Sequence, residues 1–480
     1  MSALQEFRDS LDRPDVTEVI AAGVIGNDME FETPFGTQRL LYADYTASGR
    51  ALRQVESFVA ERVLPFYANS HTEASFCGMT MTRMREEARR TIASLVNAGP
   101  EGHVIFGGSG ATAGLNLIVR LLRLKERVAA GEDVVVINSI YEHHSNILPW
   151  RESGARVVTI PGAPEGGVDL AALEETLRAD AGADLVVGSF SAASNVTGLI
   201  TDPDPVTRLL KAHGALAIWD YAGGGPYLPM DMSPAPDCAK DAIVFSPHKF
   251  VGGPAATGVA VIRDTIVDGV TSTAPGGGTV SFVSPWRHAY SPRVEAREEA
   301  GTPNVIGDIR AALAMLVKDA IGAARIGPRD HALRARGIER LAAHPDIRLL
   351  GPAVTEGALP IFSFQVRDNT GAPVHHQLFT RMLSDLYGVQ VRGGCACAGP
   401  YAHELLGLDQ ATSERLFSRL EGGHEIDKPG WVRLNLSYAH TDDQVARILD
   451  AVTDLAGDVA SNAARYSADA ATARFTALAG

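Results

Sequence analysis

The stretch Asp241-Ala-Ile-Val-Phe-Ser-Pro-His-Lys-Phe250 decides how the rest of the chain is interpreted. Its apolar segment, Ala242 to Phe245, is typical of a short buried strand. Lys249 follows where that strand ends, and open α/β sheets bind ligands at the carboxyl ends of their strands. A lysine in that setting loses its proton more easily than a surface lysine and can form a Schiff base. Most lysines after a strand are merely solvated, so the interpretation depends on which other residues reach the same edge.

The bulk composition indicates a soluble globular enzyme of roughly two or three domains. The chain has 480 residues, of which 45% are hydrophobic and 21% charged. Its net charge of −14 argues against nucleic acid or an anionic membrane surface as the main partner. No apolar run approaches the ~20 residues of a membrane helix, and the N-terminus has no apolar signal region. Four cysteines are too few for a disulfide framework, so we expect a cytoplasmic protein with reduced thiols.

Strands and helices alternate through the first two thirds of the chain, which predicts an α/β fold with a mainly parallel seven-stranded sheet. Helices should cover both faces of that sheet. The predicted strands are residues 104–106, 134–137, 155–160, 185–190, 215–219, 243–245 and 257–262. We assign residues 31–320 to this large domain.

The pattern changes from about residue 330, after a predicted helix over about 305–321 that leads out of the large domain. Strands are predicted at 360–366, 389–392 and 431–437, with helices between them, so residues 321–456 form a smaller α+β domain. Residues 1–30 are predicted to be an N-terminal arm that packs with the small domain, and 457–480 an Ala-rich helix or tail.

A glycine-rich turn follows the strand at 104–106, and a helix begins near Thr112. Backbone N–H groups and the positive end of the helix make such a turn an anion site, most often for phosphate. The turn matches neither the P-loop nor the dinucleotide-binding pattern, so a plain strand-to-helix turn is the alternative.

Four polar residues, His143, Asn195, Asp220 and Lys249, each lie just past a predicted strand. Parallel strands deliver their carboxyl ends to one edge, where the Gly110–Thr112 turn is also expected. Each residue alone has a structural explanation, but together they match the needs of pyridoxal 5′-phosphate.

Each residue of this set has an expected task in holding that cofactor. Asp220 would keep the pyridinium nitrogen protonated, His143 would stack on the ring, and Asn195 would donate to the ring hydroxyl. The residues suited to the phosphate are Gly110, Ala111, Thr112, Ser246 and His248.

The chain resembles the class V aminotransferase family of fold-type I enzymes, and among them most the group II cysteine desulfurases and selenocysteine lyases. The stretches that carry the resemblance run in the family's order over about residues 41–440. They are YADYTASG, GATAGLNLI, YEHHSNILPW, SNVTG, WDYAG, FSPHK, EAGTPN, RGGCACAGP and VRLNLSY.

The resemblance implies pyridoxal 5′-phosphate, an amino-acid substrate and Lys249 as the Schiff-base lysine. Thr302 resembles a residue that reaches the phosphate of the neighbouring subunit, which implies a homodimer with shared sites. Arg433 resembles the arginine that holds the substrate carboxylate, a role that suits its planar fork, and Arg392 is a second candidate. His71 could line the site, or be an ordinary structural histidine.

A loop cysteine takes sulfur from the substrate in the desulfurases, and counting five residues on from Arg392 leads to Cys397. The resemblance thus implies removal of sulfur or selenium from cysteine or selenocysteine, giving alanine and a persulfide on Cys397 for a possible acceptor protein. Cys395 and Cys397 also allow a redox pair or half a metal site, although the chain has no second pair, and we expect no metal. They could equally be small residues in a tight loop.

The chain departs from the family's pattern at two points. Gly223 stands where a glutamine would contact the ring hydroxyl, and the loop reads Gly-Gly-Cys-Ala-Cys without polar residues before the cysteine. Because class V folds also host aminotransferases, C–S lyases and epimerases, those reactions stay open. A non-catalytic binding or carrier protein is the remaining alternative.

Overall fold

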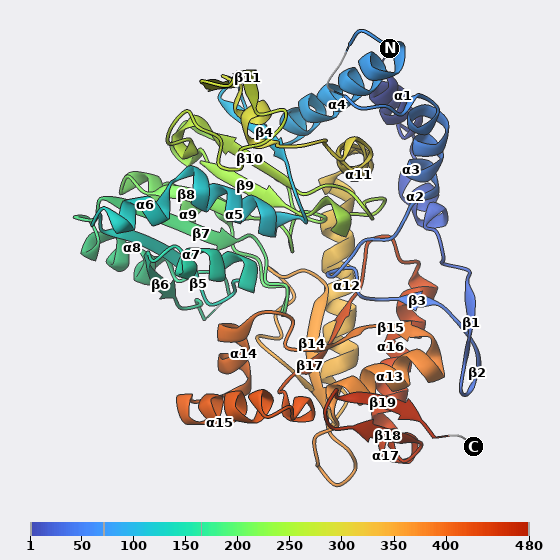
Figure 1. The fold of residues 1–480 in the computed structure, drawn as a ribbon. Helices are drawn as coiled ribbons and strands as arrows, with labels where there is room; N and C mark the ends of the chain where they lie inside the picture. Colours follow the sequence, from blue (N-terminus) through green and yellow to red (C-terminus); the bar gives the residue numbers. More distant parts are fainter. Residues whose placement is uncertain (1, 71–72, 165, 479–480) are drawn as a thin grey trace. The chain divides into compact units, whose positions relative to one another are not determined.

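The computed structural model describes residues 2–70, 73–164 and 166–478. Contacts divide the chain into two compact units, which are described separately (Figure 1). Unit 1 consists of Met1–Val24, Ser48–Ala192 and Thr201–Ala323, and unit 2 of Ile25–Ala47, Ala193–Ile200 and Ala324–Gly480. Unit 2 thus takes two short segments from the first half of the chain, which a division at single points in the sequence does not anticipate.

Unit 1 is built on a seven-stranded sheet of order β4-β10-β9-β8-β7-β5-β6. β10 runs antiparallel to both of its neighbours and the other paired strands are parallel, so the predicted α/β fold with a mainly parallel sheet is confirmed. The strands are β4 (Gly102–Phe106), β5 (Val134–Ser139), β6 (Arg156–Ile160), β7 (Leu185–Ser191), β8 (Leu216–Asp220), β9 (Ala242–Phe245) and β10 (Val259–Arg263).

Helices cover both faces of this sheet. Ile218 of β8 belongs to the same apolar cluster as Leu115 of α5 (Ala111–Leu121). The next residue, Trp219, donates from its indole to Thr207 Oγ1 of α9 (Pro203–Ala212) at 3.0 Å. Since successive side chains of a strand point to opposite faces, α5 and α9 lie on opposite sides of the sheet. The strands are therefore apolar along their length, as their sequence predicts.

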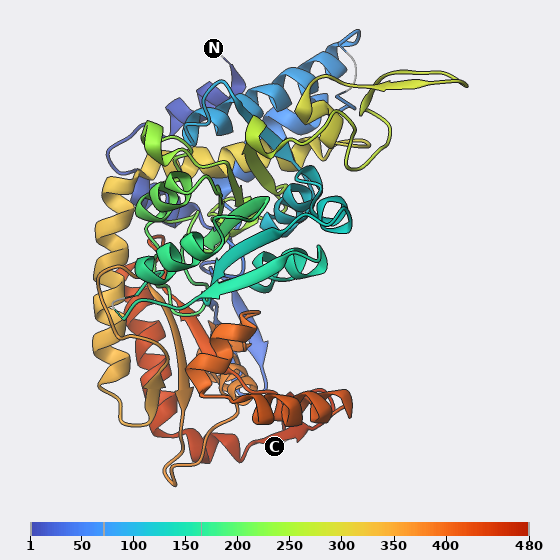
Figure 2. The same cartoon turned by 90° about the vertical axis from the view of Figure 1, so that its left-hand side faces the viewer.

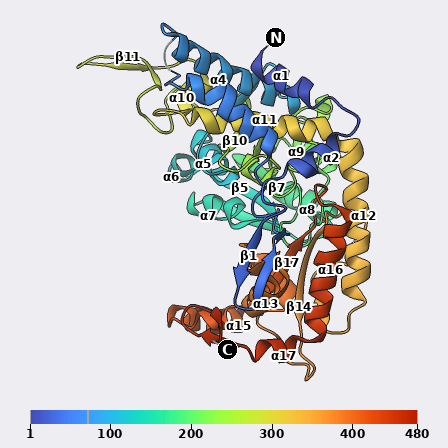
Figure 3. The same cartoon turned by 90° about the vertical axis from the view of Figure 1, so that its right-hand side faces the viewer.

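The other helices of unit 1 complete these layers and the N-terminal part (Figures 1 and 3). They are α1 (Ala3–Ser10), α2 (Val16–Gly23), α3 (Arg53–Phe58), α4 (Phe76–Leu95), α6 (Leu124–Ala129), α7 (Leu148–Glu152), α8 (Leu170–Ala179), α10 (Val294–Glu298) and α11 (Val305–Ile321). A hairpin of β11 (Val280–Val283) and β12 (His288–Tyr290) extends away from the sheet of unit 1 (Figure 2).

Unit 2 has a four-stranded antiparallel sheet of order β13-β14-β17-β16. Its strands are β13 (Ile347–Leu349), β14 (Ile361–Val366), β16 (Arg392–Gly394) and β17 (Trp431–Asn435). A parallel pair, β3 (Leu41–Tyr42) and β15 (Val389–Gln390), adjoins it. The helices are α12 (Ala323–Ala342), α13 (His376–Tyr387), α14 (Gly399–Leu406), α15 (Gln410–Glu421), α16 (Asp442–Gly457) and α17 (Val459–Ala463). An apolar core of α12, α13 and α16 residues packs with β14 and β17.

The two ends of the chain fold within different units. The described residues up to Val24 belong to unit 1, where the Phe7 and Phe58 rings lie 5.4 Å apart. After α17, the predicted Ala-rich tail forms a hairpin of β18 (Tyr466–Asp469) and β19 (Arg474–Ala477). The Tyr466 hydroxyl donates to Asp385 at 3.2 Å, which anchors a segment whose composition indicates a helix. Among the described residues, no helix is long and apolar enough to cross a membrane.

Candidate functional site

Asp220 and Lys249 follow neighbouring parallel strands of unit 1. β8 ends at Asp220, and β9 leads through Ser246 into a short 3₁₀ turn, Pro247–Lys249. Asp220 is 2% exposed, and its carboxylate accepts a hydrogen bond from Ala222 N at 2.7 Å. Burial raises the pKa of Asp220, while the positive charge of Lys249 lowers it. Because β8 and β9 pair in parallel, the structure places the predicted carboxylate and lysine at the same edge of the sheet.

The glycine turn at the start of α5 is shaped by a close approach of Ser246. Gly110 has φ +73°, and a Cβ built on it would lie 2.4 Å from Ser246 Oγ and 3.0 Å from the His248 ring. Ser246 Oγ accepts a hydrogen bond from Ala111 N at 2.9 Å. Only glycine fits this backbone conformation and this gap. Burial and the Lys249 charge lower the pKa of His248.

A hydrogen-bonded chain joins this turn to His143. Thr112 Oγ1 and Ser145 Oγ lie 2.7 Å apart, and Ser145 Oγ lies 3.0 Å from His143 Nδ1. His143 Nδ1 also accepts from Ser145 N at 3.1 Å, which places the proton of the neutral ring on Nε2. Two predicted site residues are thus connected through Ser145, which the sequence interpretation had not assigned, although it lies within the quoted stretch YEHHSNILPW.

Glu142, the residue before His143, is fully buried and holds the His143 segment to β7. Its carboxylate accepts hydrogen bonds from Ser139 Oγ at 2.6 Å and from Asn146 Nδ2 at 2.6 Å. It also accepts from the Ser191 backbone N–H at 3.0 Å and from the Ser191 hydroxyl at 2.5 Å. Burial raises the pKa of Glu142 to about 7, although these donors oppose the shift. The sequence interpretation had not assigned Glu142 either.

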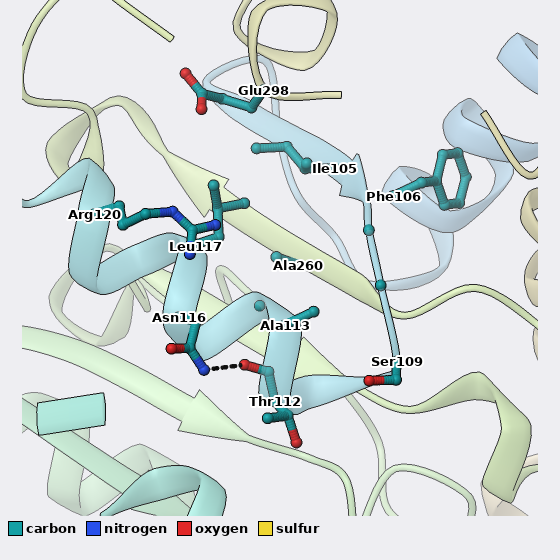
Figure 4. A pocket seen from close by; sticks show the side chains of 13 residues that line it. Ile105, Phe106, Ser109, Thr112, Ala113, Asn116, Leu117, Arg120, Ala260 and Glu298 are labelled. Carbon is teal, nitrogen blue, oxygen red and sulfur yellow. Dashed lines mark hydrogen bonds between the residues drawn. The ribbon is translucent and has the colours of Figure 1, made fainter. Parts of the chain in front are cut away.

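A cavity of about 400 Å³ lies beside the glycine turn and the first turns of α5 (Figure 4). Its polar lining includes Ser109, Thr112, Asn116 and Arg120, and Asn116 donates to the Thr112 carbonyl at 2.9 Å. The lining includes the end of β4 and the turn that follows it, from Ile105 to Ser109, but not Asp220 or Lys249.

In unit 2, Asp44 joins the two predicted substrate-binding arginines. Arg392 and Arg433 face each other directly across β16 and β17. Asp44 Oδ1 accepts from Arg433 Nη2 at 2.8 Å, and Asp44 Oδ2 accepts from Arg392 Nε at 3.0 Å. The Arg433 side chain is 5% exposed and that of Arg392 53%. Burial lowers the pKa of Arg433, and Asp44 offsets part of that effect.

The predicted nucleophile lies on a tight turn that follows β16. Ala398 N donates to the Cys395 carbonyl at 3.3 Å, and the two residues between them, Ala396 and Cys397, have φ +53° and +56°. These left-handed values at non-glycine residues are those of a strained turn. Cys397 is exposed and Cys395 is half-buried. Asn195 Nδ2 donates to the Ala396 carbonyl at 2.7 Å, a contact that the sequence did not predict.

The remaining predicted residues have no described partner in the site. Thr302 is exposed in the loop before α11, Gly223 brings no side chain, and His71 lies outside the described residues. Within residues 2–70, 73–164 and 166–478, no three His, Cys, Asp or Glu side chains are grouped to hold a metal ion.

The family model for class V aminotransferases matches residues 41–448. The chain belongs to the class V aminotransferase family. It is 30% identical over 385 residues to a probable cysteine desulfurase of Pyrococcus abyssi, a match that covers 79% of this chain and 90% of the relative. A cysteine desulfurase of Salmonella typhimurium is 30% identical over 365 residues, covering 75% of this chain and 85% of the relative.

Solved structures of cysteine desulfurases share this fold. The apo cysteine desulfurase of Thermococcus onnurineus NA1 is 25% identical with a TM-score of 0.71, covering 87% of this chain and 94% of that one. A cysteine desulfurase of Escherichia coli, 22% identical with a TM-score of 0.67, covers 95% of this chain and 98% of its own, and it supports the fold. The family's enzymes use pyridoxal 5′-phosphate, so this class V aminotransferase is a pyridoxal-phosphate enzyme acting on an amino acid.

The residues of unit 1 fit this cofactor. The absence of a Cβ at Gly110 lets Ser246 and His248 lie close to the start of α5, whose positive end stabilises a phosphate. A buried carboxylate and a lysine lie at adjacent strand ends, as the pyridine nitrogen and the aldehyde of the cofactor require.

Proposed function

We propose that the protein is a cysteine desulfurase, removing sulfur or selenium from L-cysteine or L-selenocysteine to give alanine and a persulfide on Cys397. Two kinds of support lead to this function within the class V family. Relatives that carry the name cysteine desulfurase match most of the chain. Cys397, the predicted nucleophile, supplies an exposed thiol. It lies on the Cys395–Ala398 turn, which begins three residues after Arg392.

Unit 1 would hold the cofactor. Gly110, Ala111, Thr112, Ser246 and His248 would take the phosphate. Asp220 would keep a proton on the ring nitrogen, Lys249 Nζ would hold the aldehyde carbon, and the His143 imidazole would cover the ring face. When bound, pyridoxal phosphate supplies an electron sink for the negative charge that develops at the substrate α-carbon.

The chain's own groups then have distinct tasks in the reaction. Arg433, with Arg392 as a second candidate, would hold the substrate carboxylate, and Lys249 Nζ would take the proton from the substrate α-carbon. The Cys397 thiolate would attack the substrate sulfur, so that a S–S bond forms on Cys397 while the substrate C–S bond breaks. Protonation of the carbon left behind gives alanine, which balances the reaction without an added oxidant.

Cys397 is the observation that separates this function from the other class V reactions. Transamination, β-elimination and epimerisation need no thiol on the enzyme, whereas sulfur transfer requires one that solvent and substrate can reach. Gly223, in place of the family's glutamine, would remove a contact to the cofactor that all these reactions share, so it favours none of them.

The test is to incubate the holoenzyme with L-cysteine and a reducing thiol and to follow alanine, keto acid and sulfide. Cys397→Ser should keep the bound cofactor but release neither sulfide nor alanine. Cys395→Ser, on the same turn, is the matched control and should release both. Undiminished sulfide from Cys397→Ser, or keto acid as the main product of the unmodified enzyme, would reject the proposal.

The proposal includes a cytoplasmic homodimer with shared sites and a protein that accepts the sulfur. Support for reduced surroundings comes from the cysteines, since Cys77, Cys238, Cys395 and Cys397 are all free thiols. Support for a dimer comes from Thr302, which is exposed in this chain although the family places a cofactor contact there. Sedimentation should give a dimer mass. If each site takes Lys249 from one subunit and Thr302 from the other, mixing Thr302→Ala with Lys249→Ala should restore cofactor binding at one site per mixed dimer.

A further inference from the structure

Asn195 has two contacts in unit 2 that its expected cofactor role does not explain. Its side-chain amide donates to the Ala396 carbonyl at 2.7 Å, between the two cysteines of the turn. Its own carbonyl accepts from Arg433 Nη1 at 3.2 Å. The residue is 8% exposed, so water competes little for either bond.

The Ala396 contact matters because the turn is strained. Left-handed backbone at two consecutive non-glycine residues persists only where the surroundings impose it. The Ala398–Cys395 bond that closes the turn is long, at 3.3 Å, whereas the Asn195 amide bond is short. The amide therefore supplies a strong external restraint on the position of Cys397.

Arg433 connects the same residue to the charges of the site. The guanidinium is fixed by Asp44 on Nη2 and by the Asn195 carbonyl on Nη1, and its Nε is buried without a hydrogen-bond partner among the described residues. A substrate carboxylate that binds Arg433 would therefore bind a guanidinium that already donates a hydrogen bond to the Asn195 carbonyl.

We propose that Asn195 is a positioning residue for sulfur transfer, which ties the arginine of the substrate carboxylate to the turn that carries Cys397. The role in sulfur transfer rests on the proposed function of Cys397, whereas the restraint of the turn by Asn195 does not depend on that function. Asn195 acts through the Ala396 carbonyl and does not itself touch the sulfur that is transferred.

Hydrogen exchange of the holoenzyme tests the restraint directly. In Asn195→Asp a carboxylate oxygen replaces the amide donor and faces the Ala396 carbonyl, so the turn should open more often. We expect the peptide containing Ala398 N–H to exchange about tenfold faster than in the unmodified enzyme, the change for one good hydrogen bond. The same variant should lower kcat for sulfide release more than it raises KM for cysteine, since a misplaced thiol affects the step after binding.

The matched control is Ser363→Ala. Ser363 Oγ donates to the Val196 carbonyl at 2.7 Å, so this variant disturbs the same segment and leaves the Ala396 bond in place. Its turn should exchange within twofold of the unmodified enzyme. Equal exchange of the turn in Asn195→Asp and the unmodified enzyme, or equal acceleration in Ser363→Ala, would overturn the proposal. If the enzyme proves not to be a desulfurase, the exchange result still stands by itself.

Discussion

Replacing Asp44 with asparagine should lower the free energy of unfolding of unit 2 by about 3 kcal/mol. Asp44 neutralises Arg433, whose side chain is 5% exposed, through a 2.8 Å bond. Removing one member of a buried ion pair costs about 3–5 kcal/mol, because the other charge stays buried. The asparagine oxygen keeps one acceptor, which returns about 1 kcal/mol. The facing Arg392 adds a like charge across β16 and β17, which opposes that recovery.

Urea unfolding followed by hydrogen exchange of the β16 and β17 peptides measures this effect within unit 2. A chain with two compact units need not unfold in one step, so a signal from the whole molecule is less suitable. A loss of about 3 kcal/mol should move the transition of these peptides down by about 1 M urea or more.

Arg392→Gln is the matched control for Asp44→Asn. It removes the other bond of Asp44, but the Arg392 side chain is 53% exposed, so the pair contributes less than about 1 kcal/mol. A loss below about 1 kcal/mol in Asp44→Asn, or an equal loss in Arg392→Gln, would refute the assignment of Asp44 as the counter-charge of the buried arginine.

Three further predictions concern unit 1. Gly110→Ala should weaken pyridoxal phosphate binding about thirtyfold in an absorbance titration, because the positive φ and the displacement of Ser246 each cost about 1 kcal/mol. Gly107→Ala is the control: no heavy atom lies within 4 Å of its Cβ position, so this variant should bind the cofactor normally. Burial raises the pKa of Glu142 to about 7, so the folded protein binds its proton more tightly than the unfolded chain does. The stability of the unmodified enzyme should therefore fall by roughly 3 kcal/mol as pH rises from about 4.5 to about 7. Glu142→Gln should flatten this pH dependence. An unchanged slope in urea midpoints would contradict the burial of that charge. Lys249→Ala should lose the visible absorbance of the attached cofactor, and borohydride should no longer fix it to the chain; retention of both would remove Lys249 from its role.

The sheet of unit 1 was predictable because its strands are short, mostly apolar runs, and several of them, such as β8 and β9, lead directly into polar residues. Asp220 and Lys249 follow neighbouring strands by that rule alone, and the glycine turn before α5 follows from its composition. Such features are local in the sequence, and parallel order brings them to one edge.

The contacts of unit 2 were not predictable in the same way. Asp44 meets Arg433 because the segment after β3 runs beside β17, where Asp44 pairs with Asn435. Arg392 joins them because it lies opposite Arg433 in the β16–β17 pair. These partners are far apart in the sequence. Asn195 was interpreted from its place after a strand, yet its described bonds lie in unit 2. The C-terminal hairpin likewise has distant partners, Asp385 and Phe35 for Tyr466 and His375 for Phe475, which its own composition does not indicate.

Mass mapping of the sulfur tests the proposed function most directly. The holoenzyme, freed of added thiols, is given one equivalent of L-cysteine, quenched with an alkylating reagent, digested and weighed. We predict the mass of one extra sulfur on the peptide that contains Cys397, an equal amount of alanine in solution, and no extra sulfur on the Cys77 or Cys238 peptides. Alanine or keto acid formed without sulfur on Cys397 would contradict the proposed function.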